Sequence, residues 1–346
     1  MAYVHKGSSK TLYNRYEDPH NILIEEIGPG YAIYRREWEE TTKFNLKKTF
    51  PIQLDFELNV SCNLKCPMCT WSATETFGQG KTSWMDLEFY KKLVQEGVEN
   101  GLRAVNLNYV NEPLIRPDLY EFVKFARDVG VVEVMFNTNG LLLTDDMTVN
   151  LIDAGLTKLS ISIDAFTPET YAIVRPGGDY NKLLEIIHRF LVIRAEKSER
   201  MPLLKLTFLK MSTNIHELEP FLGYWEDKAD LFSIQNLHNP FDGDLRDAKN
   251  RYYVGGPPDL AGETPRCPSP FQRMTVRFNG DVLPCCNFRA ATDLVVGNAK
   301  NSDLSSIWNS KKMSVLRETH VSGRYQDNPV CKACIDNSQM WAPEVR

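Results

Sequence analysis

Residues 52–69 read IQLDFELNVSCNLKCPMC, and this stretch decides the fold. Its first half alternates apolar and polar residues from Ile52 to Asn59, which is typical of a β-strand that buries one face. Its second half places cysteines at positions 62, 66 and 69 directly after that strand. The order of strand and thiols predicts a ligand-binding loop at the carboxyl end of a barrel strand, where active sites form.

The composition of the chain indicates a soluble globular protein of one large or two smaller domains. It has 346 residues, 42% of them hydrophobic and 25% charged, with a net charge of −5. No Lys/Arg-dense run argues for nucleic acid, and neither a signal peptide nor an apolar membrane span is present, so we expect a cytoplasmic protein. The eight cysteines are then expected to be reduced, as metal ligands or catalytic thiols.

Strand and helix patterns alternate along the chain and predict an α/β fold, a parallel barrel, closed or partial, over residues 52–238. A Pro/Gly-rich linker is expected at 239–266, and a small second domain at 267–346. The N-terminal extension, residues 1–51, is expected to form a β-hairpin in which 22–27 and 31–34 flank a Gly28-Pro29-Gly30 turn. Strands are expected near 52–58, 103–109, 132–137, 158–164, 203–209 and 231–237, and helices near 83–99, 117–128, 144–154, 181–197 and 216–227.

The expected strands alternate apolar and polar residues, whereas fully buried parallel strands are usually apolar throughout. If helices cover the apolar faces, polar side chains must line the interior and form a wet cavity for a polar ligand. The alternative is an open sheet with one solvated face. The polar residues expected inside are Asn106, Asn108, Lys205, Thr207 and Gln235.

The three thiols of the first cluster suit an iron–sulfur cluster, because soft thiolates bind such clusters. Three cysteines leave one iron of a four-iron cubane without a protein ligand and free to bind a substrate or cofactor. The alternative is a zinc site whose fourth ligand lies elsewhere. The three residues are Cys62, Cys66 and Cys69.

In this context the chain resembles the radical S-adenosylmethionine (SAM) superfamily, whose Cys-x3-Cys-x2-Cys signature follows the first strand of a barrel. The resemblance implies a partial (β/α)6 TIM-like barrel. Strand ends at Glu112-Pro113, at Asn137-Thr138-Asn139-Gly140 and at Ser160-Ile-Ser162-Ile-Asp164 are similar to the family's SAM-binding turns. Asn111 replaces the usual Gly, and Met68 replaces a residue that is often aromatic. Each of these residues has an alternative interpretation as a turn or cap residue, and Arg175 as a partner of a surface carboxylate. The resemblance implies SAM contacts at Met68, Glu112, Asn139, Ser162, Asp164 and Arg175.

The later cysteines resemble the SPASM auxiliary-cluster domain in its short form, called Twitch. The resemblance implies one further [4Fe–4S] cluster, and thus two such clusters and SAM as cofactors; the alternative is a zinc ribbon. A hairpin is expected from Met274 to Leu283, around the Asn279-Gly280 turn. Cys286 is left over, either as a packed residue or as a catalytic hydrogen-atom donor. The implied ligands are Cys267, Cys285, Cys331 and Cys334.

The resemblance implies a mechanism in which a low-potential donor of the flavodoxin or ferredoxin type drives cleavage of SAM to a 5′-deoxyadenosyl radical. The polar interior favours a sugar, cyclitol or nucleotide-sugar-like substrate, and we expect dehydrogenation of a carbinol with the second cluster as electron acceptor. Epimerisation with Cys286 as donor is the first alternative. A peptide-modifying maturase would often carry roughly 80 residues of leader-binding domain before the barrel, where about 50 stand here. A non-catalytic zinc or iron–sulfur protein is the alternative of another class.

Overall fold

The computed structural model describes residues 9–13, 19–70, 72, 83–198, 200–237, 252, 254 and 265–336. The described residues build one ten-stranded sheet in the order β1-β7-β6-β5-β4-β3-β2-β8-β9-β10. The strands from β7 through β2 to β8 are parallel, and β1, β9 and β10 pair antiparallel at the two ends. The strands are β1 (Ser9–Tyr13), β2 (Gln53–Phe56), β3 (Ala104–Asn106), β4 (Glu133–Thr138), β5 (Lys158–Ser162), β6 (Leu203–Lys210), β7 (Leu231–Asn236), β8 (Arg273–Val276), β9 (Asp281–Leu283) and β10 (Gly297–Asn298).

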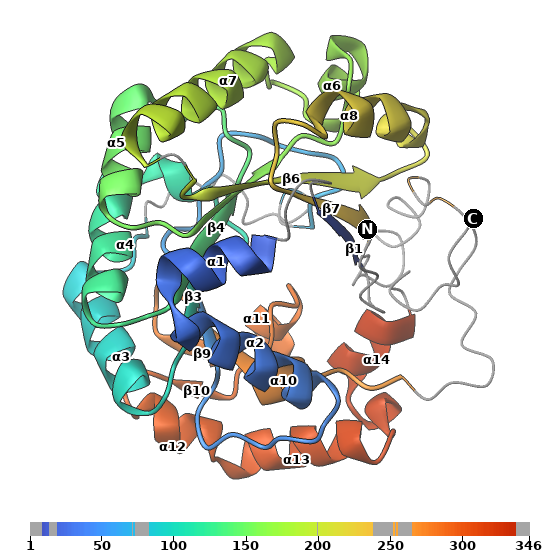
Figure 1. Cartoon of the computed structure of the whole chain (residues 1–346). Helices are drawn as coiled ribbons and strands as arrows, with labels where there is room; N and C mark the ends of the chain where they lie inside the picture. The colour runs from blue at the N-terminus through green and yellow to red at the C-terminus, as the bar shows by residue number, and fades with distance from the viewer. Residues whose placement is uncertain are drawn as a thin grey trace.

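Helices surround the curved sheet on its outer side (Figure 1), which confirms the predicted α/β partial barrel. Side chains cap three of these helices: Asp86, Thr144 and Asp179 each accept a backbone N–H in the first turn of their helix. No helix among the described residues is long and apolar enough to cross a membrane. The helices of the barrel are α3 (Leu87–Glu99), α4 (Leu119–Asp128), α5 (Asp145–Asp153), α6 (Pro168–Val174), α7 (Tyr180–Lys197) and α8 (Leu218–Trp225).

The two faces of the sheet differ in polarity, as the alternation predicted. Phe56, Phe136 and Phe208 belong to the buried apolar core under the helices. The opposite face carries charged pairs inside the barrel. Their nitrogen–oxygen distances are 3.4 Å for Arg273–Asp55, 3.0 Å for Arg277–Glu57 and 2.6 Å for Lys158–Glu133. The inner face of the barrel is therefore polar and does not form an apolar core.

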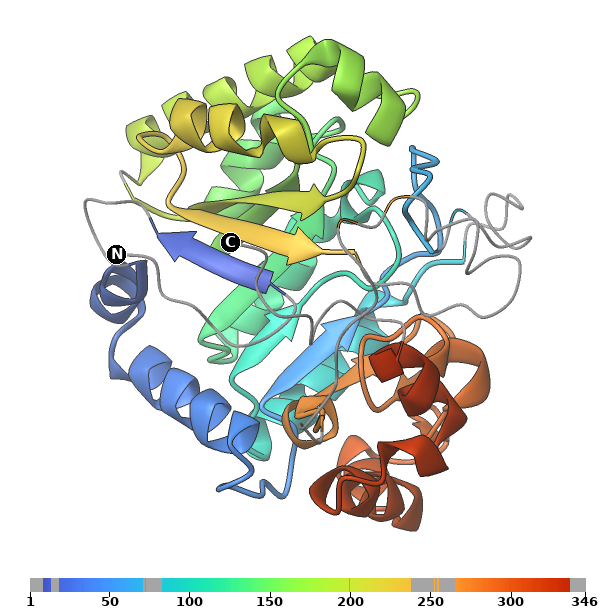
Figure 2. The same cartoon turned by 90° about the vertical axis from the view of Figure 1, so that its right-hand side faces the viewer.

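The predicted N-terminal hairpin is wrong: its residues form two helices, α1 (Pro19–Ile27) and α2 (Pro29–Thr42). Pro29 occupies the first turn of α2, where its missing N–H and fixed φ suit a helix start, and Gly28 joins the helices with a φ of 93°. Tyr31 and Tyr34 have helical spacing and pack on the first residues of several strands. Figure 2 shows that α1 and α2 close the end of the barrel from which the parallel strands start.

The C-terminal segment continues the sheet of the barrel. β8 pairs in parallel with β2, and β9 forms with β8 the hairpin expected around Gly280, whose φ is 93°. The expected linker lies almost entirely outside the described residues. The remaining helices are α10 (Ser269–Gln272), α11 (Ala290–Asp293), α12 (Leu304–Trp308), α13 (Lys311–Val321) and α14 (Pro329–Asp336).

Candidate functional site

A cavity of about 420 Å³ opens at the carboxyl ends of the barrel strands. Its wall is formed by the three-cysteine loop, by residues at or just beyond the ends of β3 to β7, and by the segment after β9. The structure brings together here every residue that the sequence placed at the first cluster or near SAM, and also the leftover thiol. These residues are Cys62, Cys66, Met68, Cys69, Glu112, Asn139, Ser162, Asp164, Arg175 and Cys286.

Polar contacts hold the backbone and the side chains of the three-cysteine loop in place. The Ser72 hydroxyl donates to the Cys66 and Cys69 carbonyls at 2.5 and 2.9 Å. The Asn139 amide donates to the Asn63 side chain at 2.8 Å and ties the loop to the turn after β4. Burial raises the pKa of the Cys62 thiol to about 12. Ligand binding that needs thiolates must therefore displace protons from this loop.

Glu112 is buried, and both of its carboxylate oxygens accept hydrogen bonds. Oε1 accepts from the Thr138 hydroxyl at 2.6 Å and from the Leu114 backbone at 3.1 Å, and Oε2 accepts from the Asn139 backbone at 2.9 Å. Burial raises the pKa of this carboxyl, and the three hydrogen bonds oppose that effect. Glu112 thus caps the short 3₁₀ helix Pro113–Ile115 and fixes the β3 turn to the β4 turn, while it remains on the cavity wall.

Arg175 and Asp164 form a buried ion pair beside the three-cysteine loop. The Arg175 Nη2 lies 2.5 Å from the Asp164 Oδ2, and its Nη1 lies 3.8 Å from the Cys66 sulfur. Asp164 has a φ of 61°, which is rare for a residue other than glycine and is typical of strained positions at ligand sites. Two buried nitrogens on the wall, Arg175 Nε and Asn111 Nδ2, have no hydrogen-bond partner among the described residues. Such orphaned donors are available to an anionic or carbonyl-bearing ligand.

A second, smaller cavity of about 30 Å³ contains the four later cysteines of the predicted cluster. Cys267 precedes α10, Cys285 follows β9, and Cys331 and Cys334 lie one turn apart on α14. Burial raises the pKa of Cys331 to about 12 and of Cys334 to about 11. The structure thus brings together four thiols that are separated by up to 67 residues, the interval from 267 to 334.

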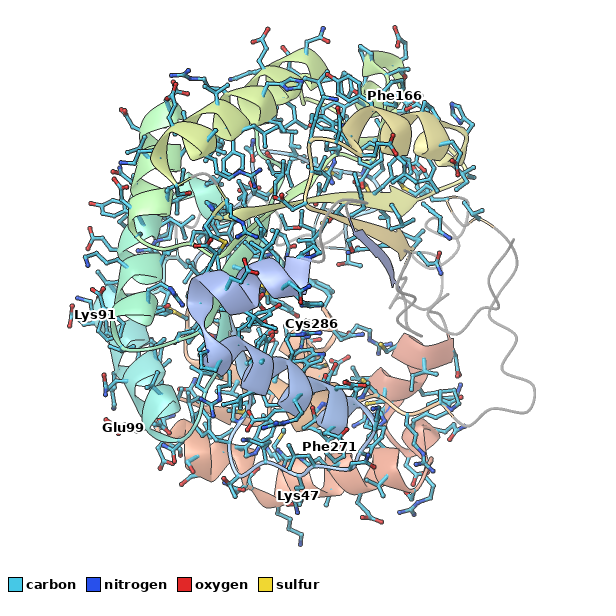
Figure 3. All side chains as sticks on the ribbon, viewed as in Figure 1. Lys47, Lys91, Glu99, Phe166, Phe271 and Cys286 are labelled. Atoms are coloured by element: carbon cyan, nitrogen blue, oxygen red, sulfur yellow. The ribbon has the colours of Figure 1, made fainter. Side chains whose placement is uncertain are left out.

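Cys286 lies on the wall of the first cavity, whereas its neighbour Cys285 lies on the wall of the second. Figure 3 shows Cys286 inside the ring of strands and helices. The Tyr109 hydroxyl donates to the Asn287 carbonyl at 2.8 Å and joins this segment to the end of β3. Two consecutive cysteines therefore connect the two cavities along the backbone.

Sequence reasoning missed several residues at these sites. His320 and Asn287 line the second cavity, and burial lowers the pKa of His320 to about 4. Nothing in the spacing of His320 marks it, because it lies on α13, apart from every cysteine in the sequence. Tyr109 lies three residues before Glu112, but the resemblance to the family's SAM-binding turn rested on Glu112 and Pro113 and gave Tyr109 no role.

Family models match the two halves of this arrangement separately. Residues 56–197 match the radical SAM superfamily, and residues 267–335 match SPASM, an iron–sulfur cluster-binding domain. The chain is a radical SAM protein with a SPASM domain. The cofactors of these domains are SAM and [4Fe–4S] clusters, as the resemblance implied.

Curated relatives of this radical SAM protein include GTP 3′,8-cyclases. A probable GTP 3′,8-cyclase of Methanococcus maripaludis strain C5 is 28% identical over 49% of this chain and 54% of that protein. The GTP 3′,8-cyclase of Alkaliphilus metalliredigens is 27% identical over 57% of each chain. The chain thus spans little more than half the length of these relatives.

Solved structures share the fold at low sequence identity. BtrN in complex with AdoMet and 2-DOIA has a TM-score of 0.55 at 19% identity, with 87% of this chain and 98% of that chain covered. SuiB of Streptococcus suis bound to S-adenosylmethionine has a TM-score of 0.62 at 15% identity, covering 88% and 76%. AnSMEcpe with bound AdoMet has a TM-score of 0.60 at 15% identity, covering 86% and 93%.

The residues present fit these cofactors chemically. Each cavity offers a thiol set, and no Asp or Glu is found among the described residues that line the second cavity, so the donors there are the soft ligands that iron–sulfur clusters prefer. In the first cavity the orphaned donors of Arg175 and Asn111 provide places for the polar end of SAM. Among the described residues, no three His, Cys, Asp or Glu side chains are placed to hold a single metal ion.

Proposed function

We propose that this radical SAM protein is an oxidoreductase that removes a hydrogen atom from a carbinol carbon of a small hydroxyl-rich substrate and oxidises that carbon to a carbonyl. One observation carries the proposal: the wall of the cavity that holds the three-cysteine loop also holds Cys286, whose neighbour Cys285 belongs to the second cavity. A substrate between the loop and Cys286 is therefore close to the path toward the second thiol set.

In this proposal Cys62, Cys66 and Cys69 hold the first cluster, and Cys267, Cys285, Cys331 and Cys334 hold the second. The reduced first cluster and SAM supply a 5′-deoxyadenosyl radical, which is the hydrogen-atom acceptor. Met68, Glu112, Asn139, Ser162, Asp164 and Arg175 position SAM beside the loop. A cluster held by the second thiol set would accept the one electron that remains after hydrogen abstraction, and the hydroxyl proton would pass to solvent, which balances the two-electron oxidation.

The lining of the first cavity favours a neutral, hydroxyl-bearing substrate such as a sugar or cyclitol. Amides and a hydroxyl from several strand ends face it, and the described lining residues include only one Lys or Arg, Arg175, which Asp164 neutralises. A nucleoside triphosphate, as the name GTP 3′,8-cyclase implies for the relatives, calls for more cations than this wall provides. The BtrN structure holds a small molecule, 2-DOIA, together with AdoMet, which agrees with this substrate class. The polar lining groups that this proposal leaves for the substrate include Asn108, Asn137, Thr207, Gln235 and Asn236.

A second candidate, epimerisation, is favoured by the position of Cys286 on the cavity wall. Its thiol would return a hydrogen atom to the opposite face of the substrate radical and become a thiyl radical. One electron from the second cluster through adjacent Cys285, together with one proton, would restore the thiol. The two outcomes differ in whether the product gains a hydrogen from solvent.

The test uses the anaerobically reconstituted full chain with dithionite, SAM and a panel of sugars and aminocyclitols in deuterium oxide. Oxidation predicts about one 5′-deoxyadenosine per carbonyl product and no new carbon-bound deuterium. Epimerisation predicts an inverted product with one carbon-bound deuterium. A low-potential flavodoxin or ferredoxin should replace dithionite. Absence of 5′-deoxyadenosine from a chain loaded with about eight irons would contradict both candidates.

Two variants separate the roles of the thiols. Cys66→Ala should abolish SAM cleavage, because one cluster ligand is lost. Cys286→Ser should leave 5′-deoxyadenosine formation intact and stop product only if Cys286 returns the hydrogen, since an alcohol O–H is a poor hydrogen-atom donor. Full carbonyl formation by Cys286→Ser would support dehydrogenation and exclude the epimerase alternative.

A further inference from the structure

Two nitrogen-bearing side chains accompany the four thiols on the wall of the second cavity, His320 from α13 and Asn287 from the segment after β9. Both are buried, at 1% and 8% exposure. The rest of that wall is apolar, formed by Pro270, Leu294, Leu316, Val330 and Ile335. A polar group in such surroundings is costly unless it has a partner, so these two side chains call for a functional explanation.

The hydrogen bonds of His320 fix which ring nitrogen carries the proton. The Cys267 backbone N–H points to the His320 Nδ1 at a nitrogen–nitrogen distance of 3.4 Å. An accepting Nδ1 carries no hydrogen, so the single N–H of the ring is on Nε2. The bond to Cys267 uses Nδ1 and not Nε2, and the ring lies on the cavity wall. The imidazole is therefore held as a donor beside the thiol set.

Asn287 is oriented in the same way. Its Oδ1 accepts from the Arg289 backbone at 2.8 Å, which leaves the amide N–H groups as the free part of the side chain. Its Nδ2 is buried and has no hydrogen-bond partner among the described residues, and Asn287 and Cys334 line the same cavity. The Tyr109 hydroxyl bonds to the carbonyl of the same residue and anchors it. Asn287 is thus a second fixed donor toward sulfur.

We propose that His320 Nε2 and Asn287 Nδ2 donate hydrogen bonds to the sulfur atoms of the cluster bound by Cys267, Cys285, Cys331 and Cys334, and raise its reduction potential so that it accepts electrons. The inference rests on the proposed function, which makes this cluster the electron acceptor. His320 and Asn287 are positioning residues, because they act on the cluster and not on the substrate.

The direction in which these donors change the reduction potential follows from the charge of the cluster. Reduction adds a negative charge to the cluster, and an apolar wall disfavours that charge. A fixed N–H dipole aimed at sulfur stabilises the more negative, reduced state, and it does so more strongly where water is excluded. Removing a donor must therefore lower the reduction potential. The change is a tuning of the cluster and needs no effect on how tightly iron is held.

The test measures the midpoint potential of the second cluster by redox titration followed by electron paramagnetic resonance. The full chain carries Cys62→Ala, Cys66→Ala and Cys69→Ala, so that the second cluster is the sole source of signal. In this background, His320→Phe should shift the midpoint to a clearly more negative value. His320→Gln keeps an N–H near the Nε2 position and should recover most of the shift. Asn287→Ser, which keeps an acceptor for Arg289, should also lower the potential.

Leu316→Met is the matched control, because Leu316 lines the same cavity and offers no N–H. Its potential should equal that of the background chain. Unchanged potentials in His320→Phe and Asn287→Ser, at about four irons per chain, would overturn the inference and leave the proposed function standing. Failure of the background chain to bind iron would instead overturn the assignment of the second thiol set. If His320→Phe does not load, the Gln and Ser variants decide the question.

Discussion

Asp164 is held by backbone and side-chain contacts from neighbouring segments and also pairs with Arg175 on the cavity wall. Its Oδ1 accepts the Leu209 backbone N–H at 2.7 Å, its carbonyl accepts the Asn214 amide at 2.8 Å, and its Oδ2 holds Arg175. These contacts keep its backbone at a φ of 61°. The sequence located Asp164 at a strand end, but its left-handed backbone and its partners depend on elements 11 to 50 residues away and have no local signal.

Asp164→Asn isolates the charge of this residue, because Asn is among the residues that best tolerate a left-handed backbone. The change leaves Arg175 buried without its counter-charge, which costs about 3 kcal/mol. We expect a lower urea midpoint and at least a tenfold weaker affinity for SAM by calorimetry. Asp153→Asn, which breaks the exposed pair with Lys197, is the control and should change neither. Unaltered stability in Asp164→Asn would mean that the pair is not formed.

Lys205 gives a pH-dependent test of the polar interior. Burial lowers its pKa to about 8, below the usual 10.5, so the unfolded chain binds more protons between these values. This group therefore makes folding more favourable as pH rises from about 8 to 10.5. Lys205→Met removes the cost of burying the charge, and we expect a gain of about 1 to 3 kcal/mol at pH 7 that shrinks toward pH 10. A gain that does not vary with pH in urea unfolding would contradict this assignment.

Elements with a strong period were predictable, and elements that depend on distant partners were not. The six barrel strands and five of the helices appear within a few residues of their expected places, because each has a local hydrophobic period. Cap residues such as Thr144 also mark where a helix starts. The prediction of a β-hairpin in place of α1 and α2 is wrong, because a Pro/Gly junction suits a turn as well as a helix start. Packing on the first residues of the strands favours the two helices. β1 and the pairing of β8 with β2 are also long-range contacts.

The turn after β4 depends on Gly140, and this gives a prediction at the scale of an element. Gly140 has a φ of 79°, and a Cβ there would come within 2.7 Å of Leu183 and 3.1 Å of Ile161. Gly140→Ala should therefore lower the unfolding free energy by about 2 kcal/mol in urea titrations. Gly223, in the middle of α8 with open space around it, is the matched control. Gly223→Ala should stabilise by up to about 1 kcal/mol, and equal effects at both sites would refute the argument.

On the scale of the whole molecule, the C-terminal segment and the barrel share one sheet and many side-chain contacts. Arg277, directly after β8, pairs with Glu57. The Gln272 amide donates to the Trp38 carbonyl at 3.1 Å, and the Trp308 indole donates to the Lys48 carbonyl at 3.0 Å. The sequence led us to expect a separate small domain there, because its cysteines follow a Pro/Gly-rich stretch. The composition identifies such a stretch, but it does not indicate that the following strand, β8, pairs with β2.

This continuity predicts that the second thiol set stabilises the whole chain and not the C-terminal segment alone. Cluster binding to the folded state is coupled to folding, so Cys331→Ala combined with Cys334→Ala should lower the melting temperature by about 5 to 10 °C in a single transition. Anaerobic calorimetry and circular dichroism should report the same midpoint. Lys332→Ala, on the exposed side of α14 between the two cysteines, should leave it nearly unchanged. An unmoved barrel transition beside a separate, earlier C-terminal one would show that the shared sheet does not couple the two parts.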